Sequence, residues 1–173
     1  MPLRTDTFDL GGLHLRSGEG RSIELAVPID AFELGEERYA VEPELVPARL
    51  DISRTVGGGF ALRLRFEATL EGPCMRCLEP AAPTFEIDVR EVSQPDGEGG
   101  ELTTPYVVGA ILDLPAWARD ALALSFPQQL LCREGCAGLC PMCGVDLNTA
   151  EPGHAHEGEP DARWAKLSEL RFE

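Results

Sequence analysis

The 173-residue sequence is poor in basic side chains. It contains 15 Lys plus Arg against 30 Asp plus Glu, a formal net charge of -15 at pH 7. A protein that binds nucleic acid with most of its surface needs the opposite balance, because it must neutralise a negatively charged phosphate backbone. The composition therefore argues against that class of protein and favours a basic partner.

Long hydrophobic runs are also missing. No stretch approaches the length of a membrane span, and the first residues contain no apolar segment of the kind found in a signal peptide. We therefore expect a cytoplasmic protein that does not span a membrane. Because the cytosol keeps thiols reduced, clusters among the six cysteines favour metal binding over disulfides.

Enzymatic residue patterns are scarce. A nuclease would need carboxylates or histidines clustered on regular elements, and the sequence offers no such cluster. His154 and His156 lie in an acidic loop rich in Gly and Pro, where we expect solvated side chains rather than metal ligands. A thiol oxidoreductase would need a Cys-x-x-Cys at the start of a helix, and neither such motif begins a helical pattern. We expect no enzymatic activity.

The most specific feature that is present is a cysteine-rich stretch from Cys132 to Asn148. Its Cys-x-x-Cys is followed by Gly144, which is typical of a zinc knuckle because glycine lets the backbone turn its N–H groups toward the sulfurs. A second Cys-x-x-Cys stands earlier in the chain. For one structural Zn²⁺ the spacing favours the local set Cys132, Cys136, Cys140 and Cys143, with Cys74 and Cys77 as alternative ligands beside Cys140 and Cys143.

The clearest periodicity lies in the middle of the chain. Three glycines at 57–59 separate the apolar positions of residues 50–56 from an unbroken alternation over residues 60–70, which predicts an antiparallel hairpin with one buried face. The alternation resumes at residues 85–89. The first Cys-x-x-Cys is therefore expected in a turn between two strands, where a functional tip would be placed.

This hairpin contains more basic than acidic residues, although the chain as a whole is acidic. Arg63 and Arg65 fall on its polar face, and Arg76 lies between the two thiols at its tip. These three residues are candidates for contact with RNA or with a partner protein. The competing interpretation is cross-strand pairing with Glu67, Glu71 or the acidic loops, because exposed pairs of arginine and glutamate are common.

The remaining patterns complete an α+β fold: a mainly antiparallel sheet that could curl toward a barrel, one packed helix, a cysteine-rich zinc-knuckle loop and a short C-terminal helix. Residues 1–20 suggest an edge strand or docked arm, residues 23–27 a strand, residues 30–44 an acidic loop, and residues 106–112 a strand. Asp113 is expected to cap a helix that ends near Phe126, with Leu124 on its core face, and Asp161 to cap a terminal helix. We expect one domain with three regions, residues 1–44, 45–126 and 127–173.

Four motifs in one order support a family resemblance. They are Cys74-Met-Arg-Cys77-Leu-Glu-Pro, the helix starting Asp113-Leu-Pro, the stretch from Cys132 to Asn148, and a final Asp161-Ala-Arg-Trp-Ala-Lys-Leu-Ser-Glu-Leu. Together they cover about residues 45–170 and resemble the YceD family of bacteria and plastids, described as large ribosomal RNA subunit accumulation proteins. The C-terminal cysteine cluster is similar to that of an actinobacterial type of member.

The resemblance implies a ribosome-biogenesis factor without enzymatic activity, which supports accumulation or processing of large-subunit ribosomal RNA. Its partners would be that RNA or a precursor particle, and a small basic large-subunit ribosomal protein, whose gene commonly lies beside that of the family member. The family motif singles out Cys74, Arg76 and Cys77. A zinc-stabilised adaptor between proteins, without RNA contact, is the alternative function, and a thiol oxidoreductase is a more distant one.

Overall fold

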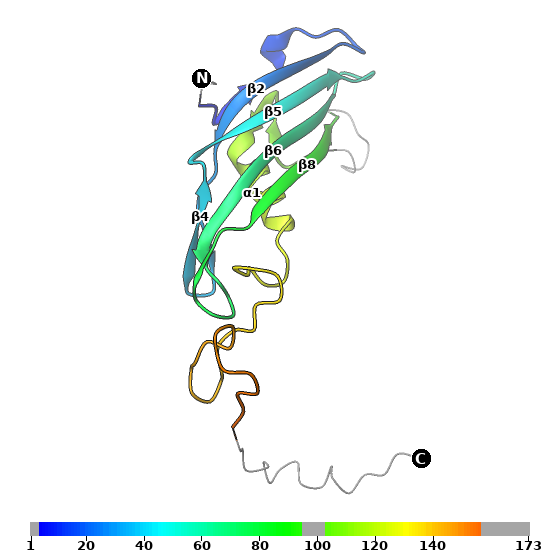
Figure 1. Cartoon of the computed structure of the whole chain (residues 1–173). Helices are drawn as coiled ribbons and strands as arrows, with labels where there is room; N and C mark the ends of the chain where they lie inside the picture. Colours follow the sequence, from blue (N-terminus) through cyan, green and yellow to red (C-terminus); the bar gives the residue numbers. More distant parts are fainter. Residues whose placement is uncertain (1–3, 95–102, 157–173) are drawn as a thin grey trace, which may run out of the picture.

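The computed structural model describes residues 4–94 and 103–156, which fold into ten strands, one turn of 3-10 helix (Gly11–Leu13) and one α-helix (Figure 1). The strands are β1 (Thr7–Asp9), β2 (Gly20–Pro28), β3 (Phe32–Leu34), β4 (Glu37–Glu42), β5 (Leu45–Arg54), β6 (Phe60–Pro73), β7 (Pro80–Ala81), β8 (Thr84–Ser93), β9 (Val107–Val108) and β10 (Ile111–Asp113). The helix α1 spans Leu114–Leu124. The predicted α+β class is confirmed.

The strand β6 is the centre of the main sheet. Along one edge it pairs with β5 and then with β4, and along the other it pairs with β8 and β7, all antiparallel. The sheet continues from β5 to β2 and from β4 to β3. Within the described part of the chain, β2 pairs with β5 and β8 pairs with β6, but β2 and β8 do not pair with each other, so the sheet is open and does not close into a barrel.

The alternation of apolar residues in β6 has the predicted consequence. Its even-numbered positions from Phe60 to Leu70 are buried, and they pack in one hydrophobic cluster with α1 and with inward residues of β2, β5 and β8. The odd-numbered positions lie on the opposite side of the sheet, which we call the outer face. The register places Arg65 of β6 directly between Arg49 of β5 and Asp88 of β8, so the outer face is a layer of charged side chains.

The helix begins where its sequence predicted. The Asp113 carboxylate accepts a hydrogen bond from the Ala116 N–H at 3.0 Å, which satisfies one of the free donors of the first turn. Trp117 and Leu122 are among its buried residues. The prediction for Leu124 is wrong: it is 87% exposed, because it is the last residue of the helix and no described residue covers it.

Residues 30–44 are not the acidic loop that their charge suggested. They form the β3–β4 hairpin, which turns at Gly35 with a φ of 69°. Phe32, Tyr39 and Val41 supply its buried positions, while its acidic side chains point to solvent. The charge of those exposed positions hid a period-two pattern that was present in the sequence.

The N-terminal arm is docked as expected. β1 pairs with β10, and β10 with β9, so the single strand predicted over residues 106–112 is a short hairpin that turns at Gly109. The strand predicted at residues 23–27 is part of β2. The terminal helix predicted from Asp161, and residues 95–102 of the predicted loop, lie outside the described residues. No helix in the described part of the chain is long and apolar enough to cross a membrane.

Candidate metal centre and the adjoining groove

Both Cys-x-x-Cys motifs adopt the same turn. In the first knuckle (Cys74–Leu78), the Leu78 N–H donates to the Cys74 carbonyl at 3.0 Å; in the second knuckle (Cys140–Gly144), the Gly144 N–H donates to the Cys140 carbonyl at 2.8 Å. The residue after the second cysteine has a positive φ in each case, 64° at Leu78 and 74° at Gly144. The turn expected from Gly144 is therefore also made by a leucine.

The first knuckle lies between β6 and β7, at the end of the sheet nearest the cysteine-bearing loops (Figure 1). The chain after α1 returns to this knuckle and begins a C-terminal module, residues 130–156. The Met75 N–H donates to the Leu130 carbonyl at 2.9 Å, and the Leu139 N–H donates to the Arg76 carbonyl at 3.0 Å. These backbone contacts fix the module against the knuckle before any metal is considered.

Gly138 allows this close approach. Its φ is 79°, and a Cβ atom at this position would lie 3.0 Å from the Arg76 carbonyl oxygen and 3.2 Å from the Arg76 Cβ. Both the backbone conformation and the tight contact favour glycine at this position. The docking of the module therefore depends on a residue without a side chain.

Four thiols converge at this junction and form what we call the first cluster: Cys74, Cys77, Cys132 and Cys136. Their sulfurs all lie within 4.8 Å of one another, with 3.8 Å between Cys74 and Cys136 and 3.6 Å between Cys77 and Cys132. Tetrahedral Zn²⁺ with Zn–S bonds of about 2.3 Å places its sulfurs about 3.8 Å apart. The cluster therefore has the spacing of a four-thiolate zinc site.

Two of the four thiols in the first cluster have surroundings that favour the thiolate, Cys74 and Cys136, whereas burial and the neighbouring thiols raise the pKa of Cys77 and Cys132. Burial raises the pKa of the Cys74 thiol, but the backbone N–H groups of Arg76, Cys77 and Cys132 lower it, and the result is about 6. At Cys136 burial also raises the pKa, whereas the Asn148 side-chain amide, 3.5 Å from the sulfur, lowers it, and the net shift is downward. N–H groups directed at sulfur are the outer contacts expected around a metal-bound thiolate.

A second cluster lies farther along the module and consists of Cys140, Cys143, His154 and His156. The Nε2 atoms of the two histidines are 3.1 Å apart, and they lie 3.5 Å (His154) and 3.2 Å (His156) from the Cys143 sulfur. Cys140 is buried, while the other three residues are exposed. The backbone N–H groups of Cys143 and Met142, together with the His154 side chain, lower the pKa of the Cys140 thiol to about 6.

The structure divides the predicted ligands differently from either set favoured by the sequence. Cys132 and Cys136 lie with Cys74 and Cys77, whereas Cys140 and Cys143 lie with two histidines. Sequence spacing favoured the local set because it has the shortest loops. The module instead docks on the first knuckle, which places Cys132 and Cys136 beside Cys74 and Cys77. The histidines, expected to be solvated side chains of a loop, are exposed but lie with Cys140 and Cys143 in a group that could hold a metal ion. The sequence signal for this grouping was the His-x-His that follows the second knuckle.

The candidate arginines have different surroundings. On the outer face, Arg63 makes two hydrogen bonds to Asp88, with 2.7 Å from Nε to Oδ1, and Arg65 Nη2 lies 2.6 Å from Asp51 Oδ2. Cross-strand pairing thus accounts for both. Arg76 is exposed at the tip of the first knuckle and makes no ion pair with another described residue. Of the three, only Arg76 offers an uncompensated charge.

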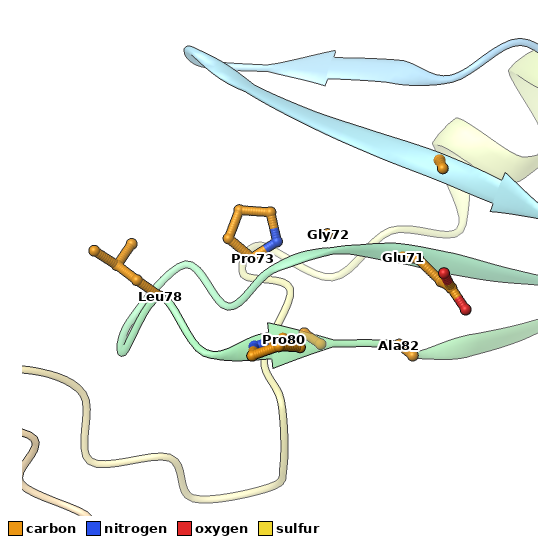
Figure 2. Close-up of a pocket in the computed structure, with 8 residues that line it drawn as sticks. Glu71, Gly72, Pro73, Leu78, Pro80 and Ala82 are labelled. Carbon is orange, nitrogen blue, oxygen red and sulfur yellow. The ribbon is translucent and has the colours of Figure 1, made fainter.

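An apolar groove adjoins the first knuckle. One hollow of about 570 Å³ lies between β4, β6 and β7, and a second of about 540 Å³ lies between the knuckle and the β3–β4 turn. Leu78 lines both hollows and is 63% exposed; in Figure 2 it projects from the turn at one end of the first hollow, with Glu71 at the other. Glu33 and Glu37 line the second hollow, so the groove is apolar with acidic residues along it.

Comparison with known proteins decides the family. Residues 62–171, which include the first knuckle, the helix and the whole module, match the family described as Large ribosomal RNA subunit accumulation protein YceD. The chain belongs to the YceD family. The family description associates its members with accumulation of large-subunit ribosomal RNA.

The similarity of this YceD protein to its relatives extends over nearly all of its length. The uncharacterized protein Rv2926c of Mycobacterium tuberculosis is 34% identical over 172 residues, which cover 95% of this chain and 80% of the relative. The uncharacterized protein ML1660 of Mycobacterium leprae is 28% identical over 169 residues, covering 94% and 76%. The similarity therefore includes the N-terminal strands that the family match leaves out. No solved structure matches the chain.

Proposed function

We propose that this protein is a non-enzymatic, cytoplasmic factor that supports accumulation or processing of large-subunit ribosomal RNA by binding a small basic large-subunit ribosomal protein. The binding site would be the groove beside the first knuckle. The observation that carries the proposal is Leu78, an exposed leucine held in a left-handed conformation on an acidic groove.

The conformation of Leu78 costs stability in the free protein. A non-glycine residue in the left-handed region loses about 1–2 kcal/mol relative to the right-handed one, and the second knuckle has glycine at the equivalent position. At 63% exposure, the leucine recovers little of this cost through burial. A partner that covers the side chain would supply the missing burial, which is the behaviour of an interface anchor.

The charge of the groove indicates the chemistry of the partner. Glu71 lines one hollow, and Glu33 and Glu37 line the other, on a chain whose formal net charge is -15. Acidic residues along an apolar floor suit a segment that carries Lys or Arg on either side of an apolar side chain. Ribosomal proteins of the large subunit are the basic proteins that the family description makes relevant.

Direct RNA binding has less support on the outer face. Arg63 and Arg65 already pair with Asp88 and Asp51, so a phosphate would have to displace a carboxylate at each of them. Arg76 alone remains available beside the groove, and one exposed arginine is a small electrostatic contribution. We therefore favour a protein partner over RNA.

In this proposal, one structural Zn²⁺ at Cys74, Cys77, Cys132 and Cys136 holds the groove in shape. Four thiolates leave no open coordination position, which suits a structural ion rather than a catalytic one. The ion would clamp the first knuckle, and with it Met75 and Leu78, to the C-terminal module. The same closed site argues against metal-dependent catalysis at this position.

The test uses the full-length protein and purified large-subunit ribosomal proteins, offered one at a time. We expect one basic protein to bind, and Leu78→Ala to weaken that binding by about tenfold or more. Leu124→Ala removes another exposed leucine, far along the chain, and should leave affinity unchanged. Equal affinity of the Leu78 variant and the wild type would overturn the groove as the binding site.

Capture from cells separates the protein partner from RNA and from an adaptor role elsewhere. We expect the tagged protein to retain the same ribosomal protein after nuclease treatment. Loss of all ribosomal material with nuclease, and equally with Arg63, Arg65 and Arg76 changed together to Glu, would favour RNA binding instead. Retention of a basic protein foreign to the ribosome would favour the adaptor function.

A further inference from the structure

We propose that the second cluster, Cys140, Cys143, His154 and His156, binds a Zn²⁺ ion of its own, so that the protein holds two zinc ions rather than one. None of these four residues belongs to the first cluster. The proposal stands or falls independently of the partner proposed above, because it depends only on the geometry of the module.

The distances fit a mixed site of two thiolates and two imidazoles. With Zn–N bonds of about 2.0–2.1 Å and Zn–S bonds of about 2.3 Å, a tetrahedral site places its nitrogens about 3.3 Å apart and each nitrogen about 3.6 Å from a sulfur. The observed values are 3.1 Å between the nitrogens, and 3.5 Å and 3.2 Å from nitrogen to the Cys143 sulfur. All four ligand atoms lie within 4.8 Å of one another.

Convergence of the two histidines needs a cause. His154 and His156 are exposed and come from a short loop that the His154 N–H closes onto the Glu151 carbonyl at 3.1 Å. Solvated imidazoles would be free to point apart, yet both direct Nε2 at the same sulfur. A shared metal ion binds the lone pairs of both nitrogens. A hydrogen bond between the two rings would use the lone pair of only one of them.

The backbone around the cysteines is also built as a knuckle. Besides the turn at Gly144, the Cys140 N–H donates to the Val145 carbonyl at 2.8 Å, and Leu139 forms a bridge with Asp146. The turn matches that of the first knuckle, whose two thiols belong to the first cluster with its zinc spacing. The second knuckle thus presents two sulfurs, and the loop at 151–156 completes the set with two nitrogens.

The two sites should differ in how readily they release metal. The first cluster has three buried residues out of four and only thiolate ligands, whereas the second has three exposed residues and two neutral imidazoles. A chelator reaches an exposed ion more easily, and fewer thiolates bind Zn²⁺ less strongly. The second ion should therefore leave first. Its role would be to fix residues 151–156 against the second knuckle.

The experiment is elemental analysis of the full chain, purified without chelator and saturated with Zn²⁺. We expect about two zinc ions per chain, falling to about one in the double variant His154→Ala/His156→Ala. His14→Ala, which changes the third histidine of the sequence, is the matched control and should keep both ions. Wild-type zinc of one per chain, unaltered by the double histidine variant, would overturn the proposal.

Cobalt substitution tests the ligand set directly. Co²⁺ bound to two sulfurs and two nitrogens absorbs at shorter wavelength than Co²⁺ bound to four sulfurs. We expect the wild-type spectrum to contain both contributions, and the double histidine variant to keep only the four-sulfur one. A wild-type spectrum with the four-sulfur contribution alone would contradict a mixed site even if two metals were present.

Discussion

The sulfurs of Cys74 and Cys136 lie 3.8 Å apart, although the two residues are 62 positions apart in the chain. The first belongs to the turn after the central strand β6, and the second to the module that follows α1. A metal ion shared by these sulfurs would therefore join the end of the sheet to the C-terminal module. The proposed partner groove adjoins this junction and is lined by residues of the first knuckle, so its shape should depend on the same ion.

Replacing Leu78 with Gly should separate stability from binding. Glycine adopts a φ of 64° without strain, so we expect the free energy of unfolding to rise by about 1 kcal/mol while affinity for the basic partner falls. Urea unfolding in excess Zn²⁺ and a binding titration measure the two effects. Leu78→Ala is the control, since it removes the same contact but keeps the strain. A Leu78→Gly protein less stable than Leu78→Ala would refute the strain argument.

Asn148 should strengthen metal binding without touching the metal. Its side-chain amide donates to the Cys136 sulfur at 3.5 Å, and its carbonyl oxygen accepts from the Ala137 N–H at 2.8 Å. Loss of such an outer contact lowers metal affinity by about 10–100-fold. We therefore expect the Asn148→Ala protein to lose the zinc of the first cluster at a chelator concentration that is lower by about the same factor.

This measurement is best made in the His154→Ala/His156→Ala background, so that the first cluster alone contributes. Thr149→Ala is the neighbouring control, because the Thr149 hydroxyl donates only to the Asp146 carbonyl. Equal chelator sensitivity of the Asn148 and Thr149 variants would mean that the amide does not support the first site.

Gly138 should be required for docking of the module. Gly138→Ala introduces a strained φ and also a Cβ 3.0 Å from the Arg76 carbonyl oxygen. Gly135→Ala has a similar φ of 70° but meets no atom within 4 Å, so it measures the strain alone. We expect limited proteolysis to cut the module of the Gly138 variant faster than that of the Gly135 variant. Equal cleavage rates would show that the close approach to Arg76 contributes nothing.

Asp51 should make the sheet sensitive to acid. Hydrogen bonds from Ser22, Arg65 and Arg49 lower the pKa of this carboxyl to about 2, although partial burial opposes them. Because the folded pKa lies below the unfolded value of about 3.9, the stabilisation is complete above about pH 4 and disappears as the pH falls toward 2. We expect this stabilisation to be on the order of 1 kcal/mol, since the ion pair of Asp51 with Arg65 is partly exposed.

The matching variants are Asp51→Asn and, as a control, Asp30→Asn at an exposed position. Above pH 4 the Asp51 variant should unfold at lower urea concentration than the wild type, and the two curves should approach each other in more acidic solution. Acid releases zinc from all three proteins alike, so their differences isolate the carboxylate. A gap between Asp51→Asn and wild type that persists at pH 2 would contradict this assignment.

The sequence predicted those parts of the fold that local patterns determine. Alternation gave β6, and Asp113 gave the start of α1, because each pattern acts over a few neighbouring residues. The β3–β4 hairpin was missed because exposed glutamates around Gly35 outweighed the buried positions of Phe32 and Tyr39. A charged outer side does not prevent a strand from burying its other side.

The grouping of the candidate metal ligands shows the limit of spacing arguments. Short loops made the set from Cys132 to Cys143 the simplest, but the observed grouping depends on backbone contacts between Met75 and Leu130 and between Arg76 and Leu139. No local sequence pattern predicts those contacts, because they join backbone groups that are far apart in the chain. The pairing of Arg63 with Asp88 likewise needed the register of β8, although pairing as such was foreseeable.

The most direct test of the proposed function is the ratio of large-subunit to small-subunit ribosomal RNA in cells whose only copy of the gene encodes Leu78→Ala. Cells with Leu124→Ala and cells without the gene are measured beside them, with equal protein and zinc content verified for the two variants. We predict that Leu78→Ala lowers the ratio as deletion does, while Leu124→Ala leaves it at the wild-type value. A ratio unchanged by Leu78→Ala, in cells where deletion lowers it, would contradict the groove as the functional surface.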